Sequence, residues 1–221
     1  MEQQTLVSSH FIINYWEDTQ VINEILETLE NNYTRIVSIL QVELADKCVL
    51  YIYPSIDMFH QAIDETDAED WLAGRFDNGT IKMVSPNNPG SEHDYDSVMA
   101  IAVHELVHLV AEHVNNCAPD YIAEGLATYL AGQDENVKEF IQDDLINGNF
   151  PSMTQLKSMK EEVYHYGYAF IKYVMSEYGV DGVLKLYKSV DVNTALNIDE
   201  NEFHKNWKAY LTETCLAGID K

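Results

Sequence analysis

The chain has 221 residues, 46% of them apolar and 14 of them tyrosine, and its net charge is −24. This length and composition fit one sizeable folded domain or two small lobes, and they exclude an intrinsically disordered chain. The negative charge repels nucleic acid and anionic lipid and would attract cations or basic peptides, and the alternative is a solubilising surface with no specific partner.

The first half of the chain alternates strand and helix patterns. His10–Trp16 is short and β-leaning, which predicts a first strand. Apolar residues recur at helical spacing over Gln20–Gln41, in a stripe wide enough to bury one face of a helix. Lys47–Pro54 is a continuous apolar run ended by proline, which predicts a buried strand, and Ser55 can cap a short helix that runs to Ile63.

A hairpin and a long helix are expected next. Asn78-Gly79 is the dipeptide preferred by a type I′ turn, so Thr80–Val84 is expected to be the return strand of a β-hairpin. After a loop rich in proline and glycine, Asp94 or Asp96 can cap a long helix that continues to Val114.

The residue pattern of the second half predicts helices throughout. Pro119-Asp120 opens a helix that ends near Gly132, and Gly179 is expected to stop a later one. The remaining helices are expected at about Glu135–Leu145, at Glu161–Tyr178 and in two segments after Gly179. The order predicts an α+β fold of two lobes, residues 1–115 with a mixed sheet, helices and the central long helix, and residues 116–221 with helices alone.

The central helix carries the sequence AVHELVHLVAEH. His104 and His108 lie four residues apart and so share one face of a helix, where two imidazoles can converge on one zinc ion. Glu105 lies about 100° round the helix, close enough for its carboxylate to act as a base toward a water at that ion. The flanking residues are apolar almost all round, and buried imidazoles need partners. The stretch therefore predicts a catalytic zinc site.

A catalytic zinc needs a third protein ligand, for which three residues are candidates. His113 follows His108 by five residues where the HExxHxxGxxH pattern needs six, and Ala111 replaces the glycine of that pattern. Asp120 is better explained as a helix cap. Glu124 lies one turn into the next helix, which a helical hairpin would turn back toward the histidines, so Glu124 is the expected ligand.

HELVH followed by IAEGLATYLAG resembles the gluzincin metallopeptidases, most closely the peptidase MA-like domains and more distantly the thermolysin-like and aminopeptidase-N-type enzymes. The resemblance covers most of the chain and implies a two-lobed zincin-like fold. The chain departs from the larger aminopeptidases in its spacing, because only 15 residues separate His108 from Glu124.

Peptide hydrolysis also needs a hydrogen-bond donor for the developing oxyanion. In the aminopeptidase relatives a tyrosine in the motif Y-x-K-G has this role, and the matching register here nominates Tyr164. Tyr166 stands in place of the lysine of that motif, and His165 or Tyr166 are alternative donors. A structural role for these tyrosines in the core is the other interpretation.

The resemblance also implies how substrate binds. The strand Thr80–Val84 precedes the metal helix, as the substrate-aligning edge strand does in gluzincins, so an extended peptide is expected to pair with it. No G-x-M-E-N-type loop is present, which favours an endopeptidase. His10, His60, His93 and His204 are isolated and receive no role.

The sequence therefore predicts a metallopeptidase that binds one Zn²⁺ and acts on a peptide or protein substrate, and the acidity of the chain favours a basic one. The alternatives are a non-catalytic zinc-binding or peptide-binding module with the same fold, and a zinc hydrolase of another substrate.

The expected location is cytoplasmic. The N-terminus MEQQTLVSSHF lacks the basic start and apolar core of a secretion signal, and no apolar run approaches the roughly 20 residues of a membrane span. The chain has three widely spaced cysteines, Cys48, Cys117 and Cys215, which do not form the pattern of a disulfide framework. They are therefore expected to be small buried residues in a reducing compartment.

Overall fold

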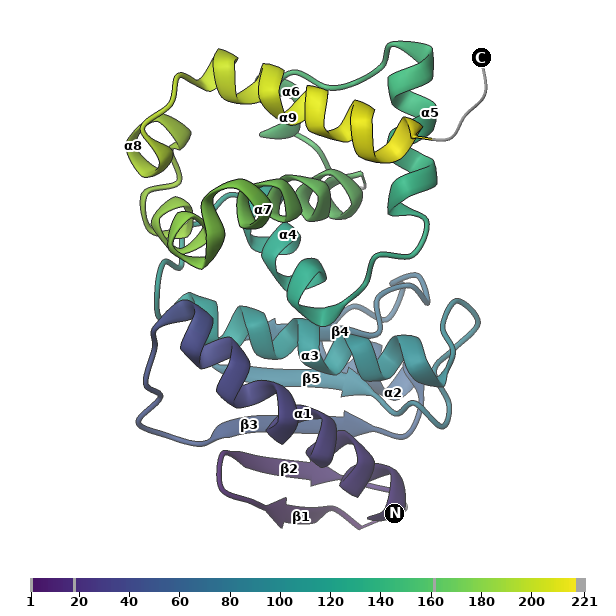
Figure 1. Ribbon diagram of the computed structural model, residues 1–221. Coiled ribbons are helices and arrows are strands. Elements are labelled where there is room, and N and C mark those ends of the chain that lie inside the picture. The colour runs from purple at the N-terminus through teal and green to yellow at the C-terminus, as the bar shows by residue number, and fades with distance from the viewer. Residues whose placement is uncertain (1, 18, 161, 218–221) are drawn as a thin grey trace. The chain divides into compact units, whose positions relative to one another are not determined.

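The structure is a computed structural model that describes residues 2–17, 19–160 and 162–217. The chain divides into two compact units, Met1–His113 and Val114–Lys221. The first combines a five-stranded sheet with helices, and the described part of the second contains helices and no strand. The protein is therefore of the α+β class (Figure 1).

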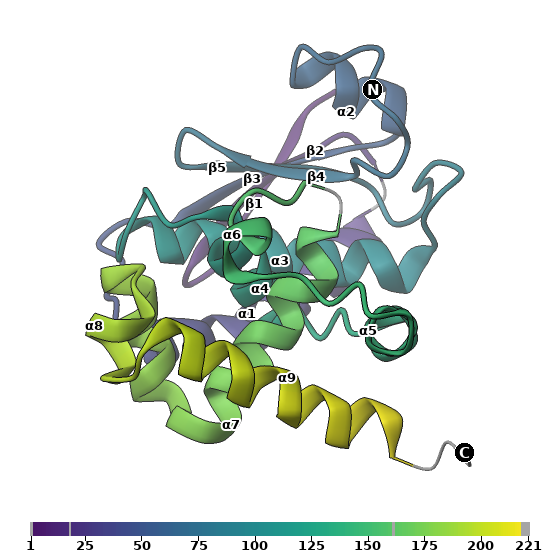
Figure 2. The same ribbon diagram turned by 90° about the horizontal axis from the view of Figure 1, so that it is seen from above.

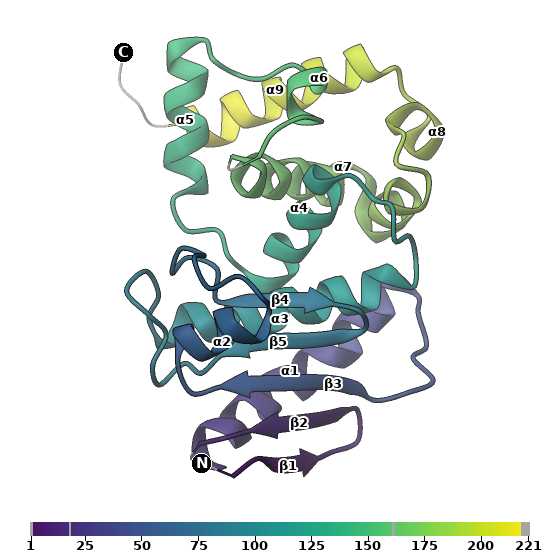
Figure 3. The same ribbon diagram turned by 180° about the vertical axis from the view of Figure 1, so that it is seen from behind.

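The sheet of the first unit has the strand order β1-β2-β3-β5-β4, seen clearly in Figure 3. The three inner strands run parallel, and the two edge strands, β1 and β4, are antiparallel to their neighbours. Asn78 and Gly79 have positive φ values of 49° and 74°, so the predicted hairpin turn is confirmed. The strands are β1 (Gln4–Val7), β2 (Phe11–Tyr15), β3 (Cys48–Tyr53), β4 (Gly74–Asp77) and β5 (Thr80–Val84).

Helices cover the two faces of this sheet unequally. Figure 2 shows α1 (Thr19–Leu40) and α3 (Tyr95–Glu112) on one face and the short α2 (Ile56–Ala62) on the other. Along β3, buried residues alternate with half-buried ones, as the period of a strand requires when one face is covered more fully. Ser55 caps α2, as predicted, by accepting a hydrogen bond from the backbone N–H of Met58.

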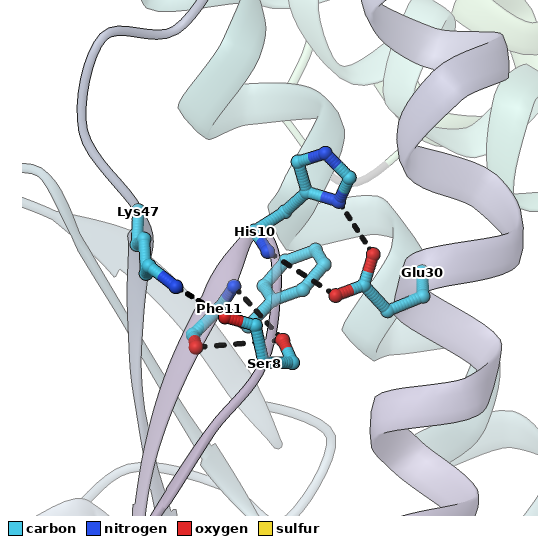
Figure 4. A network of polar contacts seen from close by, with 5 residues as sticks. All are labelled: Ser8, His10, Phe11, Glu30 and Lys47. Carbon is cyan, nitrogen blue, oxygen red and sulfur yellow. Dashed lines mark hydrogen bonds and ion pairs between the residues drawn. The ribbon is translucent and has the colours of Figure 1, made fainter.

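A polar network ties the β1–β2 hairpin to α1 (Figure 4). The Glu30 carboxylate accepts a hydrogen bond from the His10 backbone N–H at 3.2 Å and lies 2.5 Å from His10 Nδ1. The His10 ring stacks on Tyr33 of the same helix, with 4.0 Å between ring centroids, and the Lys47 ammonium donates to the carbonyl of Ser8. His10 therefore has a structural role that its isolation in the sequence did not suggest.

The second unit is a helical assembly with an aromatic core. Phe170, Phe203 and Trp207 are fully buried, and the Phe170 ring contacts Phe203 in a tilted and Trp207 in an edge-on arrangement. The predicted break at Gly179 is confirmed, since its φ of 64° and ψ of −169° belong to a region that only glycine adopts readily. The helices are α4 (Asp120–Ala131), α5 (Val137–Asn147), α6 (Met153–Leu156), α7 (Val163–Ser189), α8 (Val192–Leu196) and α9 (Glu200–Leu216).

Several expectations need correction. The strand expected at His10–Trp16 is β2, and β1 before it was not predicted. The expected helix start at Glu161 lies outside the described residues, and α7 begins at Val163. Cys117 is exposed, whereas Cys48 and Cys215 are buried as expected. Within the described ranges, no helix is both long and apolar enough to cross a bilayer.

Candidate metal centre

The helix α3 is fixed at its start by a capping box. The Asp94 side chain accepts a hydrogen bond from the Ser97 backbone N–H at 2.8 Å, and the Ser97 hydroxyl lies 2.9 Å from the Asp94 backbone N–H. Asp94 is thus the cap, and Asp96 lies within the first turn. From Ile101 to Val107 every residue of the helix is buried. The cap fixes where α3 begins, and burial packs four of the five HELVH residues into the unit.

His104 and His108 point their rings at the same place. Their Nε2 atoms lie 3.0 Å apart, and their ring centroids are 4.8 Å apart. His104 is 7% exposed, and His108 is half-buried. Two nitrogen ligands of one tetrahedral zinc ion lie about 3.3 Å apart, so the pair fits a metal with an adjustment of a few tenths of an ångström.

Glu105 is also 7% exposed, and its side chain lies against the edge strand β4. A Cβ atom at Gly74 would lie 3.2 Å from Glu105 Cγ, 3.4 Å from Glu105 Oε1 and only 2.4 Å from Ile101 Cγ2. Any side chain at position 74 would therefore overlap α3. Because Gly74 has no side chain, the helix and the Glu105 carboxylate can approach the β4 backbone closely.

The prediction that Thr80–Val84 is the edge strand of the sheet was wrong. β5 (Thr80–Val84) pairs with β3 on one side and with β4 on the other, so its backbone hydrogen-bonding groups are already used. The edge next to α3 is β4, the outgoing strand of the hairpin. An extended peptide could add to this sheet only along β4 or β1.

Glu124 lies on α4 of the second unit and is half-buried. The helix begins after Pro119, which occupies the cap position, and Asp120 is its first residue. The expected cap at Asp120 was therefore wrong, because no side chain caps this end. Burial, with the negative charge of Glu124 adding to it, raises the pKa of Tyr187 to about 12, so this tyrosine stays protonated near the carboxylate.

Among the described residues, one group of three side chains could hold a metal ion, and it consists of His104, His108 and Glu124. The other two candidates for a third ligand are not members. His113 is the exposed C-cap residue of α3, and its Nδ1 lies 3.0 Å from the carbonyl oxygen of Leu109. Asp120 is exposed in the first turn of α4.

Inside the second unit, α4 crosses α7 at a pair of glycines. A Cβ atom at Gly125 would lie 2.3 Å from the Gly167 carbonyl oxygen, and one at Gly167 would lie 2.9 Å from Gly125 Cα. Gly125 directly follows Glu124, and Gly167 lies three residues after Tyr164. The close backbone contact therefore fixes the helix of the carboxylate relative to the helix of the candidate donors.

The three candidate donors at the start of α7 have different surroundings. Tyr166 is 1% exposed, and its hydroxyl donates a hydrogen bond to Asp144 Oδ2 at 2.5 Å. Burial and this bond raise its pKa well above the usual value, so Tyr166 is a protonated core residue. The His165 ring stacks on Phe140 at 4.4 Å, and burial lowers its pKa. Tyr164 is 37% exposed.

The sequence interpretation did not identify the three glycines that shape these surroundings. Gly74, Gly125 and Gly167 each stand where a neighbouring helix or strand leaves no space for a side chain. Gly125 and Gly167 lie inside helices, where glycine costs roughly 1 kcal/mol relative to alanine, and this was the available signal of a close approach.

No protein-family model matches the chain, and no curated protein sequence matches it.

Proposed function

We propose that this protein is a zinc-dependent peptidase of the gluzincin type that hydrolyses peptide bonds. The observation that carries the proposal is the arrangement on α3. Two imidazoles converge through Nε2 atoms 3.0 Å apart, and a buried carboxylate follows the first of them in sequence. A purely structural metal site has no use for such a carboxylate, whereas hydrolysis needs a base beside the metal.

The metal ligands in this proposal are His104, His108 and Glu124. Two imidazoles and one carboxylate favour zinc over magnesium or calcium, which prefer oxygen ligands alone. Three protein ligands leave a fourth position for water, as in catalytic rather than structural zinc sites. Bound there, zinc would polarise the scissile carbonyl and lower the pKa of the water.

Glu105 is the general base of the proposed reaction. Its carboxylate accepts a proton from the attacking water and later gives that proton to the nitrogen of the leaving amine. The close packing of its side chain against Gly74 holds the carboxylate in place, so that little rotamer freedom remains to be lost when substrate binds.

Tyr164 is the proposed donor to the oxyanion. Its hydroxyl would donate a hydrogen bond to the carbonyl oxygen as negative charge develops there. The neighbouring Tyr166 is engaged with Asp144 in the core of the helical unit, which supports Tyr164 over Tyr166. The two-lobed zincin-like fold, the endopeptidase mode and the cytoplasmic location remain parts of this proposal.

The decisive experiment compares Glu105→Gln with Glu112→Gln, which changes an exposed carboxylate at the end of the same helix. Loss of a general base costs about 100-fold or more in kcat, while the ligands are untouched. We expect Glu105→Gln to keep about one zinc per chain and to lose hydrolysis of a quenched-peptide library, and Glu112→Gln to behave as the parent protein. Wild-type turnover by Glu105→Gln would refute the assigned base.

The ligand set is tested by metal analysis. Glu124→Ala should lower the zinc content, because two imidazoles alone hold the ion weakly, and Asp120→Ala and His113→Ala should leave it unchanged. Unchanged zinc in Glu124→Ala would remove Glu124 from the set. If the parent protein binds zinc but cleaves no peptide in the library, with or without added metal, the binding-module alternative replaces the enzyme.

A further inference from the structure

The helical unit contains a cavity that no part of the proposed reaction uses. It has a volume of about 260 Å³ and lies among α5, α7 and α9. Both α7 and α9 pack against α5 in this unit (Figure 1). Pockets for drug-sized ligands measure roughly 300–1,000 Å³, so this cavity suits a smaller molecule.

The inner wall of the cavity is apolar. Val137 and Ile141 from α5, Ala169 from α7 and Leu211 from α9 line it, and none of them is more than 7% exposed. Burial of an aliphatic group against this wall would remove apolar surface from water, which favours binding. The wall therefore favours a ligand with an apolar body.

Two lysines line the same cavity. Lys138 lies on α5 and Lys172 on α7, and both are exposed, so their ammonium groups reach solvent. Within the described residues neither belongs to an ion pair, whereas Arg75 and Lys157 each pair with a glutamate. Lys172 Nζ lies 5.3 Å from the centroid of the Tyr168 ring, which keeps this ammonium beside the cavity.

The carboxylate in the lining is partly used already. Asp134 accepts a hydrogen bond from the Tyr168 hydroxyl at 3.3 Å. Burial, with Asp134 adding to it, raises the pKa of Tyr168 to about 12, so this donor stays protonated at neutral pH. Two ammonium groups against one engaged carboxylate make the lining locally positive in a chain of net charge −24.

We propose that this cavity binds a small monocarboxylate with an apolar body. The ligand's carboxylate would lie between Lys138 and Lys172, and its hydrocarbon part against Ile141, Ala169 and Leu211. A cationic ligand would meet two ammonium groups, and a bare inorganic anion would leave the apolar wall without a partner. The site is distinct from the residues of the proposed hydrolysis and does not depend on them.

The test is calorimetric titration of the full chain with octanoate, with octylamine and octanol as ligands of matched length. We expect saturable binding of octanoate and at least about tenfold weaker binding of the other two, since only the carboxylate accepts charge-assisted hydrogen bonds from the two ammonium groups. N-acetyl-leucine distinguishes a peptide terminus from a lipid-derived acid as the source of the carboxylate. The tighter of the two acids identifies the ligand class.

Two variants locate the site. The double substitution Lys138→Met and Lys172→Met should weaken octanoate binding by about tenfold or more and leave octanol binding unchanged. Lys205→Met, at an exposed position of α9 outside the lining, is the matched control and should bind octanoate as the parent does. Circular dichroism checks that each variant is folded. No saturable octanoate binding by the parent, or equal binding by the double variant, would overturn the proposal.

Discussion

Tyr164 and Tyr166 differ in their exposure although they are two residues apart on α7. Tyr164 is 37% exposed, whereas Tyr166 is buried and donates to Asp144. Their hydroxyl groups should therefore matter for different properties. Tyr164→Phe should lower kcat/KM by about 10–100-fold through the loss of one donor to the oxyanion, with a smaller loss of stability than Tyr166→Phe because its side chain is 37% exposed. Peptide hydrolysis and thermal unfolding of the same sample measure both quantities.

For Tyr166→Phe we expect a loss of stability in place of a loss of activity. It leaves the Asp144 carboxylate without its donor and should lower the free energy of unfolding by about 1–3 kcal/mol. Urea denaturation followed by circular dichroism measures this loss. A large fall in kcat/KM for Tyr166→Phe, with none for Tyr164→Phe, would exchange the two assignments.

At the residue scale, local patterns in the sequence predicted much of the candidate site. The spacing of His104 and His108 fixes which helix face they share, because a helix has one period. The partner of Tyr166 was not predictable, since Asp144 lies 22 residues earlier and no local pattern links the two. Side-chain contacts between distant segments depend on how the helices pack, which a single sequence does not specify.

The crossing of α4 and α7 is the element-scale feature most closely tied to the proposed ligands. Gly125 meets the backbone of Gly167 with no room for a methyl group. Gly125→Ala should therefore push the helices apart and lower the free energy of unfolding by about 1–3 kcal/mol. Because Glu124 precedes this residue, the substitution should also lower zinc content. Urea denaturation and metal analysis measure the two effects.

Gly132→Asn is the control for this prediction. Gly132 ends the same helix with a φ of 73°, and a Cβ atom there would meet nothing within 4 Å. Asparagine tolerates this left-handed conformation, so the substitution should change stability by only a few tenths of a kcal/mol. Equal stability of Gly125→Ala and the parent protein would mean that the two helices can move apart at the crossing with little loss in the free energy of unfolding.

Elements with strong local signals were predicted well, and long-range pairing was not. The turn at Asn78-Gly79 and the helix end at Gly132 follow from the backbone freedom of these residues. The position of β5 inside the sheet depends on its pairing with β3, which lies about 30 residues earlier. β1 is short and lies at an edge, where burial leaves little pattern in the sequence.

The charge of the whole molecule acts on every ligand that approaches it. With 37 acidic and 13 basic side chains, the chain attracts cations over a distance set by the ionic strength. Only a few of the basic side chains are engaged in ion pairs with glutamate among the described residues, for example Arg75 and Lys157. Most of the negative charge therefore remains uncompensated and contributes to the long-range field.

This field predicts a preference among substrates of the proposed peptidase. At low ionic strength, a peptide with two lysines flanking the cleaved bond should show a kcat/KM about 10-fold or more above that of a matched peptide with two glutamates. Raising NaCl to about 0.5 M shortens the screening length to a few ångströms and should remove most of the difference. Peptides with two glutamines separate charge from side-chain size. A preference for lysine that persists in high salt would instead indicate a short-range contact near the cleaved bond, and a preference for glutamate would contradict attraction by the net charge.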